Sequence, residues 1–213
     1  RELTRQIAGD DRPKQFCPLV GERTLIDETR QRVAWSVSPS RTFFSVTATH
    51  VRFYAPLLAD VRSRQVVAQP GNRGTAPAIL YALLRLTAIA PSDPVAILPS
   101  DHYVSDDARF MAHVDAAFDL VTARPDLVTL LGLTPDRPET EYGWIEPAEA
   151  IVGPRGRLFH GVRRFWEKPD ASLAQTLFEE GCLWNSFVMV GFGATLLRLI
   201  EETLPQLVRA FLP

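Results

Sequence analysis

Residues 95–102 have the sequence Val-Ala-Ile-Leu-Pro-Ser-Asp-His, and this stretch decides the class of fold. Four apolar residues stopped by Pro and Ser predict a short strand buried on both faces, which is typical of a central parallel strand in an α/β protein. The strand delivers Asp101 to its own C-terminal end. Because ligands of open α/β sheets bind beyond the carboxyl ends of the strands, Asp101 is a candidate site residue. From these residues alone, an Asp that only caps a turn is the alternative.

Predicted strands and helices alternate on both sides of this stretch. Short apolar or β-branched runs predict strands, and apolar residues at helical spacing predict helices. The expected strands cover residues 42–48, 65–68, 95–98, 127–133, the later part of 137–147, 158–166 and 187–192, with a turn at 181–186. The expected helices cover residues 24–37, 53–61, 76–89, 110–123, 171–180, 194–202 and 205–212. This alternation predicts a three-layer α/β fold rather than a barrel or a sandwich.

The composition excludes several classes of protein. The chain has 213 residues, 46% of them apolar, and a net charge of −2 from scattered charged residues, so no basic stripe favours a nucleic-acid polymer. No run approaches the roughly 20 apolar residues that cross a bilayer, and no leader precedes the first element. Cys17 and Cys182 match no metal or redox spacing, and we expect both to be reduced core residues of a cytoplasmic protein.

Two loops carry groups that suit phosphate. The loop at residues 69–78 contains two glycines and leads into a helix that carries Pro77 in its first turn. Thr75 is the expected N-cap, and free backbone N–H groups at this position can bind an oxygen-rich ligand. Lys14 follows Pro13 and can serve as a fixed positive charge for a phosphate; a solvated surface lysine is the alternative.

Six segments together indicate a family. In their order and spacing the chain resembles the sugar-phosphate nucleotidylyltransferases, most closely the mannose-1-phosphate guanylyltransferases. The resemblance implies a Rossmann-like nucleotidyltransferase fold with a mixed, mostly parallel central sheet. It also implies one catalytic domain over residues 1–213, lacking the family's N-terminal glycine-rich loop and its C-terminal part. The six segments are Arg12–Phe16, Gln69–Ala78, Leu98–His102, Pro138–Ile145, Glu167–Pro169 and Leu183–Ser186.

The resemblance also implies a reaction and its residues. In this family GTP and mannose 1-phosphate give GDP-mannose and pyrophosphate by in-line attack on the α-phosphorus, with Mg²⁺ and no protein nucleophile. No nucleic-acid polymer and no membrane is expected as a partner, and a homodimer is left open. The implied catalytic residues are Lys14 and Asp101, the latter as the metal ligand; the implied nucleotide-binding residues are Gln69, Arg73, Gly74 and Thr75; and the implied sugar-phosphate-binding residues are Gly143, Glu167, Lys168 and Asn185.

One departure keeps alternatives open. Glu141 stands where the family usually has Gly, and its charge would repel the sugar phosphate unless it points away. The alternatives are a transferase for another base or sugar, or a non-catalytic sugar-nucleotide-binding regulatory relative. A dinucleotide-dependent oxidoreductase is not favoured, because no G-x-G-x-x-G follows a strand. We expect Trp184 and Phe187 to be core residues, with stacking on a ligand as the less favoured alternative, and His50 and His102 to form only local hydrogen bonds.

Overall fold

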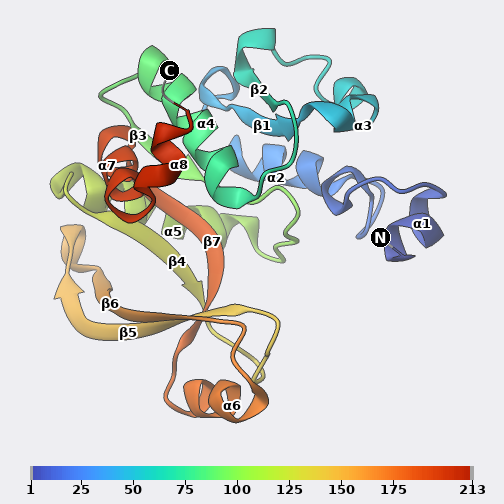
Figure 1. Cartoon of the computed structure of the whole chain (residues 1–213). Helices are drawn as coiled ribbons and strands as arrows, with labels where there is room; N and C mark the ends of the chain where they lie inside the picture. The colour runs from blue at the N-terminus through green and yellow to red at the C-terminus, as the bar shows by residue number, and fades with distance from the viewer. Residues whose placement is uncertain (1, 212–213) are drawn as a thin grey trace. The chain divides into compact units, whose positions relative to one another are not determined.

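The structure is a computed structural model that describes residues 2–211, and the chain divides into two compact units (Figure 1). Unit 1 comprises residues 2–93, 99–112 and 192–211 of the described chain, and unit 2 comprises residues 94–98 and 113–191. Among the described residues, no helix is both long enough and apolar enough to span a bilayer. Helices and strands alternate along the chain, so the α/β prediction is confirmed.

Unit 1 is mostly helical around a two-stranded parallel sheet. Strands β1 and β2 pair in register from Phe44 opposite Val66 to Thr47 opposite Gln69, so their carboxyl ends lie at the same edge. Five short 3-10 turns also occur in the described chain, of which Lys14–Phe16 matters below. The elements of unit 1 are α1 (Glu2–Ala8), α2 (Leu25–Val33), β1 (Phe44–Thr47), α3 (Val51–Leu57), β2 (Val66–Gln69), α4 (Thr75–Ile89), the first turns of α5 (Asp107–Ala123), α7 (Gly193–Thr203) and α8 (Pro205–Arg209).

The core of unit 1 forms where α2 buries its apolar face. The hydroxyl of Thr24 accepts a hydrogen bond from the Asp27 N–H, which confirms the predicted cap and starts the helix at Leu25. Ile26 then joins a cluster of side chains from the Lys14–Phe16 turn, β1 and α3. The buried members of this cluster are Phe16, Ile26, Val46, Tyr54 and Leu58.

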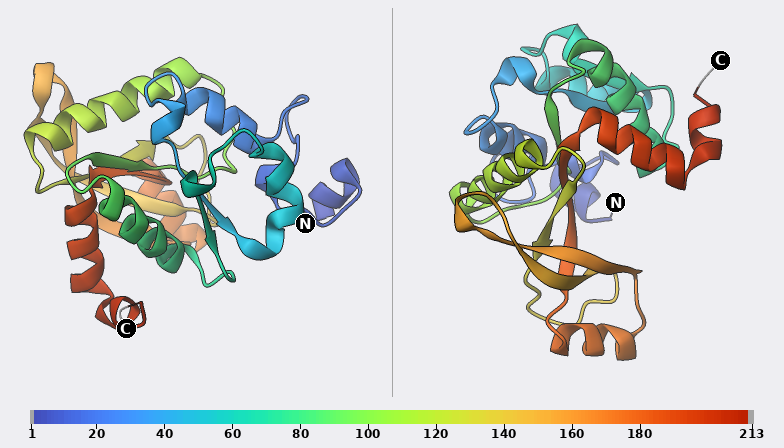
Figure 2. Two further views of the ribbon diagram at one scale, coloured as in Figure 1. Left: turned by 90° about the horizontal axis from the view of Figure 1, so that it is seen from above. Right: turned by 90° about the vertical axis from the view of Figure 1, so that its left-hand side faces the viewer.

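Helices α4 and α7 lie side by side in unit 1 (Figure 2). A Cβ atom on Gly193, the first residue of α7, would lie 2.6 Å from the Thr87 Cγ2 atom of α4. Gly193 therefore permits a close approach that any larger residue would disturb. On α4, Leu80 and Leu83 are buried while Ile89 is exposed, so the helix is less completely buried than its all-round apolar sequence predicts.

Unit 2 is built on a five-stranded sheet in which β7 pairs with β3, β4 and β5, and β6 pairs with β5. Pairs β4–β7, β5–β6 and β5–β7 are antiparallel, so the predicted mostly parallel central sheet is wrong. For β5 and β6 the physical reason is the connection at residues 153–157, which is too short for the crossover that parallel strands need. The elements of unit 2 are β3 (Pro94–Ile97), the rest of α5, β4 (Val128–Leu133), β5 (Gly143–Val152), β6 (Leu158–Glu167), α6 (Ala171–Glu179) and β7 (Leu183–Phe192).

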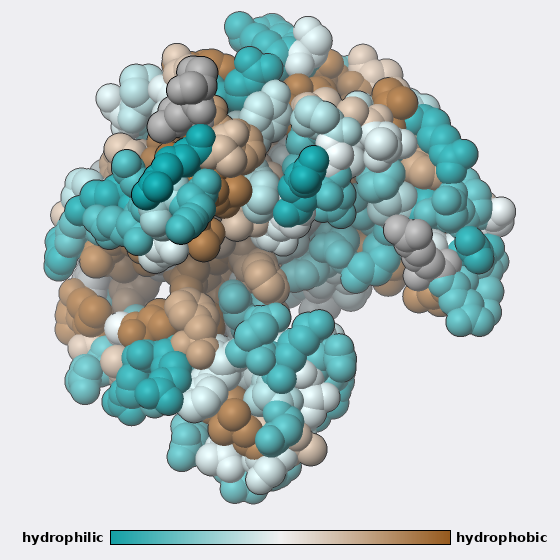
Figure 3. All heavy atoms as spheres, viewed as in Figure 1, coloured by the Kyte–Doolittle hydropathy of each residue, from teal (hydrophilic) through white to brown (hydrophobic). Residues whose placement is uncertain are grey.

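Helix α6 covers one end of the unit 2 sheet. Asp170 caps it by accepting the Leu173 N–H at 2.9 Å, and Ala174 and Leu177 are buried with Trp144 and Cys182. The opposite end of the β5–β6 hairpin carries exposed apolar side chains, visible as brown spheres in Figure 3. They are Ile151, Val152 and Leu158.

Several expected boundaries differ from the observed ones. Strand β7 begins at Leu183, so the turn predicted over residues 181–186 is wrong for its last four residues. Strand β3 is at the expected place but is half-buried rather than buried on both faces. Helix α1 was not predicted. The last predicted helix, 205–212, is observed as α8, and Leu212 lies outside the described residues.

Candidate functional site

Lys14 and Asp101 lie together in unit 1. The Lys14 Nζ atom is 3.3 Å from the Asp101 Oδ2 atom, and both side chains are partly exposed. Lys14 opens a 3-10 turn that Pro13 precedes at a φ of −60°, and Phe16 anchors the turn in the core, where it stacks on Phe53. The predicted phosphate-binding cation and the predicted metal ligand are therefore in contact.

His102 lies beside this pair. Its Nε2 atom is 3.8 Å from the Asp101 Oδ1 atom, which is longer than the local hydrogen bond that we expected from the sequence. Burial lowers the pKa of His102, with a smaller opposing effect from Asp101.

Arg32, a residue that the sequence analysis missed, binds the end of the loop that follows Asp101. Arg32 is 2% exposed, and its Nε atom donates to the Asp107 carboxylate at 2.5 Å. Its guanidinium also lies 5.3 Å from the centroid of the Phe110 ring. The available signal was the position of Arg32 on the same face of α2 as Ile26 and Thr29, both of which are buried.

The predicted nucleotide-binding loop follows β2 in unit 1. Gln69 ends the strand and donates to the Thr47 hydroxyl at 3.3 Å, while Arg73, Gly74 and Thr75 are exposed. Gly74 has a φ of +98° and is itself the N-cap of α4, with no side-chain cap. The prediction that Thr75 caps the helix is therefore wrong, because the conformation at Gly74 already turns the chain. Backbone N–H groups at the start of α4 remain available to a ligand.

In unit 2, three predicted residues meet on one face of the sheet. Gly143 pairs with Glu167 across β5 and β6. A Cβ atom on Gly143 would lie 3.0 Å from the Glu167 Oε2 atom and 3.6 Å from the Asn185 Cβ atom. The absence of a side chain at Gly143 is thus what lets the Glu167 carboxylate and the Asn185 side chain each lie close to the Gly143 backbone. Because side chains alternate along a strand, Trp144 and Trp184 face the other way, toward α6.

Lys168 and Glu141 form an ion pair beside these residues. The Lys168 Nζ atom is 3.8 Å from the Glu141 Oε2 atom, and both side chains are exposed. The Lys168 N–H donates to the Tyr142 carbonyl at 3.3 Å, with the Lys168 backbone at a φ of +46°. Glu141 therefore does not point away: its charge is directed at the lysine predicted to hold the sugar phosphate.

Asn185 lies in β7 rather than in a turn, and its neighbours differ from expectation. Its Oδ1 atom accepts the Phe187 N–H at 3.0 Å. Trp184 is half-buried and packs with the α6 core cluster, as predicted. The prediction that Phe187 is a core residue is wrong, since its side chain is 43% exposed.

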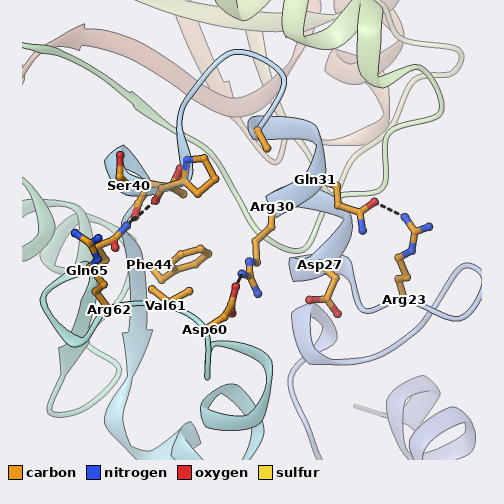
Figure 4. Close-up of a pocket in the computed structure, with 13 residues that line it drawn as sticks. Arg23, Asp27, Arg30, Gln31, Ser40, Phe44, Asp60, Val61, Arg62 and Gln65 are labelled. Atoms are coloured by element: carbon orange, nitrogen blue, oxygen red, sulfur yellow. Dashed lines mark hydrogen bonds and ion pairs between the residues drawn. The ribbon is translucent and has the colours of Figure 1, made fainter.

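A separate cavity of about 640 Å³ lies in unit 1 and contains none of the predicted site residues (Figure 4). It opens at the amino ends of β1 and β2, beside Phe44 and Gln65, whereas the predicted nucleotide loop follows their carboxyl ends. Arg30 extends into it and pairs with Asp60 at 2.5 Å. This cavity is therefore distinct from the Lys14–Asp101 pair.

The described residues contain no cluster of three or more His, Cys, Asp or Glu side chains able to enclose a metal. Asp101 offers a partly exposed carboxylate beside Lys14. Mg²⁺ is commonly bound through one or two carboxylates together with substrate phosphates and water. Asp101 fits such a shared site, and a fully protein-enclosed site does not fit.

Comparisons with known proteins agree on the family. Residues 3–204 match the family model described as Nucleotidyl transferase. The chain is 34% identical over 199 residues to the xanthan biosynthesis protein XanB of Xanthomonas campestris, covering 92% of this chain and 40% of XanB. It is 31% identical over 203 residues to mannose-1-phosphate guanylyltransferase of Escherichia coli, covering 93% of this chain and 42% of that protein. The chain thus spans about two-fifths of the length of these curated relatives.

Solved structures also match. A Thermus thermophilus structure described as mannose-1-phosphate geranyltransferase aligns with a TM-score of 0.85 at 32% identity, covering 98% of this chain and 59% of that one. A Helicobacter pylori structure described as mannose-6-phosphate isomerase aligns with a TM-score of 0.74 at 24% identity, covering 95% of this chain and 73% of that one, and supports the fold alone.

Proposed function

Because the chain belongs to the nucleotidyl transferase family, we propose that it serves the synthesis of GDP-mannose and pyrophosphate from GTP and mannose 1-phosphate. The observation that carries the proposal is the contact between Lys14 and Asp101, the cation that we propose for the phosphates and the carboxylate that we propose for the metal. The names of the Escherichia coli relative and of other relatives in polysaccharide biosynthesis support the choice of substrates.

The reaction needs positioning and charge neutralisation. A phosphate oxygen of mannose 1-phosphate forms a bond to the α-phosphorus of GTP, while the bond from that phosphorus to the bridging oxygen breaks and pyrophosphate leaves. Lys14 would neutralise charge that accumulates on the phosphates, and Asp101 would hold the magnesium ion. When bound, Mg²⁺ polarises the phosphoryl oxygens and offsets their charge. No protein nucleophile enters this scheme.

The residues proposed to bind the nucleotide belong to unit 1, and those proposed to bind the sugar phosphate belong to unit 2. In unit 1, Gln69 and Arg73 would contact the nucleotide, with backbone groups at Gly74 and Thr75 contributing N–H donors. In unit 2, Lys168 would pair with the sugar phosphate, while Glu167 accepts and Asn185 donates hydrogen bonds to sugar hydroxyls, as Gly143 leaves room between them. The nucleotide set rests on the family resemblance, and the sugar-phosphate set rests also on the grouping of Gly143, Glu167 and Asn185.

A second candidate is a non-catalytic relative that binds sugar nucleotides. The observation that favours it is the Glu141–Lys168 pair, which neutralises the cation that the sugar phosphate requires. A transferase with another base or sugar is a third possibility, since base preference depends on few contacts.

The test is pyrophosphate release by the purified protein with Mg²⁺, each of the four common nucleoside triphosphates, and mannose or glucose 1-phosphate. We expect release with GTP and mannose 1-phosphate. Faster release with another pair would keep the reaction and change the substrates. No release with any pair, from a sample with a cooperative thermal transition, would contradict the enzyme and favour the non-catalytic relative.

A further inference from the structure

Phe187 has a backbone conformation that disfavours its side chain. Its φ is +58°, in the left-handed region that glycine adopts freely and that is costly for a bulky residue. Such strain persists only when the surrounding structure imposes it, and it concentrates at ligand-binding positions. A glycine would satisfy the same backbone at lower cost, so the ring itself needs an explanation.

Side-chain hydrogen bonds of Asn185 and Ser186 hold the backbone around Phe187. The buried Ser186 hydroxyl donates to the Leu131 carbonyl at 2.5 Å and accepts the Val188 N–H at 3.1 Å. The Asn185 side chain accepts the Phe187 N–H at 3.0 Å. These bonds coincide with a register shift between β4 and β7, where the ladder is interrupted by a β-bulge or a similar irregularity. Bulges redirect side chains beside active sites.

The ring is exposed between two buried residues. Phe187 is 43% exposed, whereas Ser186 and Val188 are 2% and 1% exposed. A single exposed apolar side chain is ordinary on a protein surface. Here the exposed side chain lies at a strained position beside the register shift. The Phe187 N–H is bound by Asn185, which is grouped with Gly143 and Glu167.

We infer that Phe187 is a sugar-contacting residue whose ring packs against the apolar C–H face of a pyranose 1-phosphate. This inference rests on the proposed function and adds a specificity residue to it. Binding sites combine apolar and aromatic surfaces with a few polar groups that fix orientation. Lys168 would hold the phosphate and Glu167 the hydroxyls. The Asn185 Oδ1 atom is already used by the Phe187 N–H, which leaves the Asn185 amide N–H groups to donate to the sugar.

Phe187→Gly tests whether the ring binds the ligand or serves only the structure, because stability and binding are measured separately. This variant removes the ring and the backbone strain together, so we expect a higher melting temperature but weaker binding of mannose 1-phosphate, by about 10-fold. Phe187→Tyr keeps the ring and should bind as the wild type does. Leu158→Ala, which removes another exposed apolar side chain of unit 2, is the matched control and should leave binding unchanged.

Binding is measured by calorimetry with Mg²⁺ and the non-hydrolysable analogue α,β-methylene GTP, using mannose 1-phosphate and inorganic phosphate as separate probes. Phosphate binding should be equal in wild type and Phe187→Gly, because Lys168 is intact. If Phe187→Gly is more stable and binds mannose 1-phosphate as tightly as wild type, the ring is only structural and the inference is wrong. An equal loss for both probes would also overturn it. Failure of the wild type to bind any pyranose 1-phosphate would instead contradict the proposed function.

Discussion

Asp101 is the residue on which the proposed chemistry depends most directly. Its carboxylate is 3.3 Å from the Lys14 ammonium. Asp101→Asn keeps the shape of the side chain but makes it a poor magnesium ligand, so turnover should fall by about 100-fold or more. Pyrophosphate release measures this, and a thermal melt checks that the fold is intact. Asp93→Asn serves as the control, because it removes an exposed carboxylate that is paired with Arg41. Undiminished turnover in Asp101→Asn would contradict the metal role.

Glu141 weakens the proposed sugar-phosphate site by pairing with Lys168. Glu141→Gly frees the lysine, and because exposed ion pairs are weak, the KM for mannose 1-phosphate should fall only about two- to five-fold. Salt should reduce the difference between variant and wild type. Steady-state kinetics at two ionic strengths tests this, with Glu149→Gln as a control for an exposed carboxylate near Arg163. A raised KM would show that Glu141 assists sugar binding instead.

The pKa of Asp10 indicates whether the loop that leads to Lys14 is folded. Hydrogen bonding from the Arg12 side chain lowers the pKa of Asp10 from 3.8 to about 2. Because this pKa is lowered in the folded state, the pair stabilises the fold above about pH 4. That contribution is lost as the pH falls through about 2. An NMR titration should give the Asp10 midpoint near 2, rising toward 3.8 in Arg12→Gln. An unchanged midpoint in the variant would contradict the assignment of Arg12 as the cause.

At the scale of elements, the N-cap of α6 stabilises the helix that packs against Trp144 and Trp184. Asp170 accepts the Leu173 N–H at 2.9 Å. Asp170→Ala should lower the free energy of unfolding by about 1 kcal/mol, whereas Asp170→Asn should recover most of it. Urea unfolding followed by tryptophan fluorescence suits this test, because Trp144, Trp166 and Trp184 all lie in unit 2. The matched variant Thr24→Ala removes the corresponding cap from α2 in unit 1.

The elements with strong periodicity could be predicted, and those defined by pairing could not. Helix α5 and strand β4 were expected within three residues of their observed starts, because their apolar spacing is local information. The turn predicted at residues 181–186 failed because Asn185 favours turns locally, while pairing of β7 with β4 and β5 extends the strand. Strand direction was also wrong, since an apolar run does not distinguish parallel from antiparallel neighbours.

At the scale of the whole molecule, the family was predictable from six short segments and is confirmed by the family match over residues 3–204. Which of their residues meet was not predictable from spacing. The approach of Glu167 to Gly143 depends on strand register, and the pairing of Arg32 with Asp107 joins segments 75 residues apart. The positive φ of Phe187 leaves no mark in the sequence, because only tertiary contacts impose it.

The two cysteines give the molecule a pair of internal reporters. Cys17 lies in unit 1 and Cys182 in unit 2; both are free thiols, and they are 0% and 1% exposed. A thiol-specific reagent should therefore modify the native protein slowly and both cysteines rapidly after denaturation. Peptide mapping of the labelled sites over time would follow the opening of each unit separately, because each carries its own thiol. Equal labelling rates at both sites under all conditions would mean that the two units open as one.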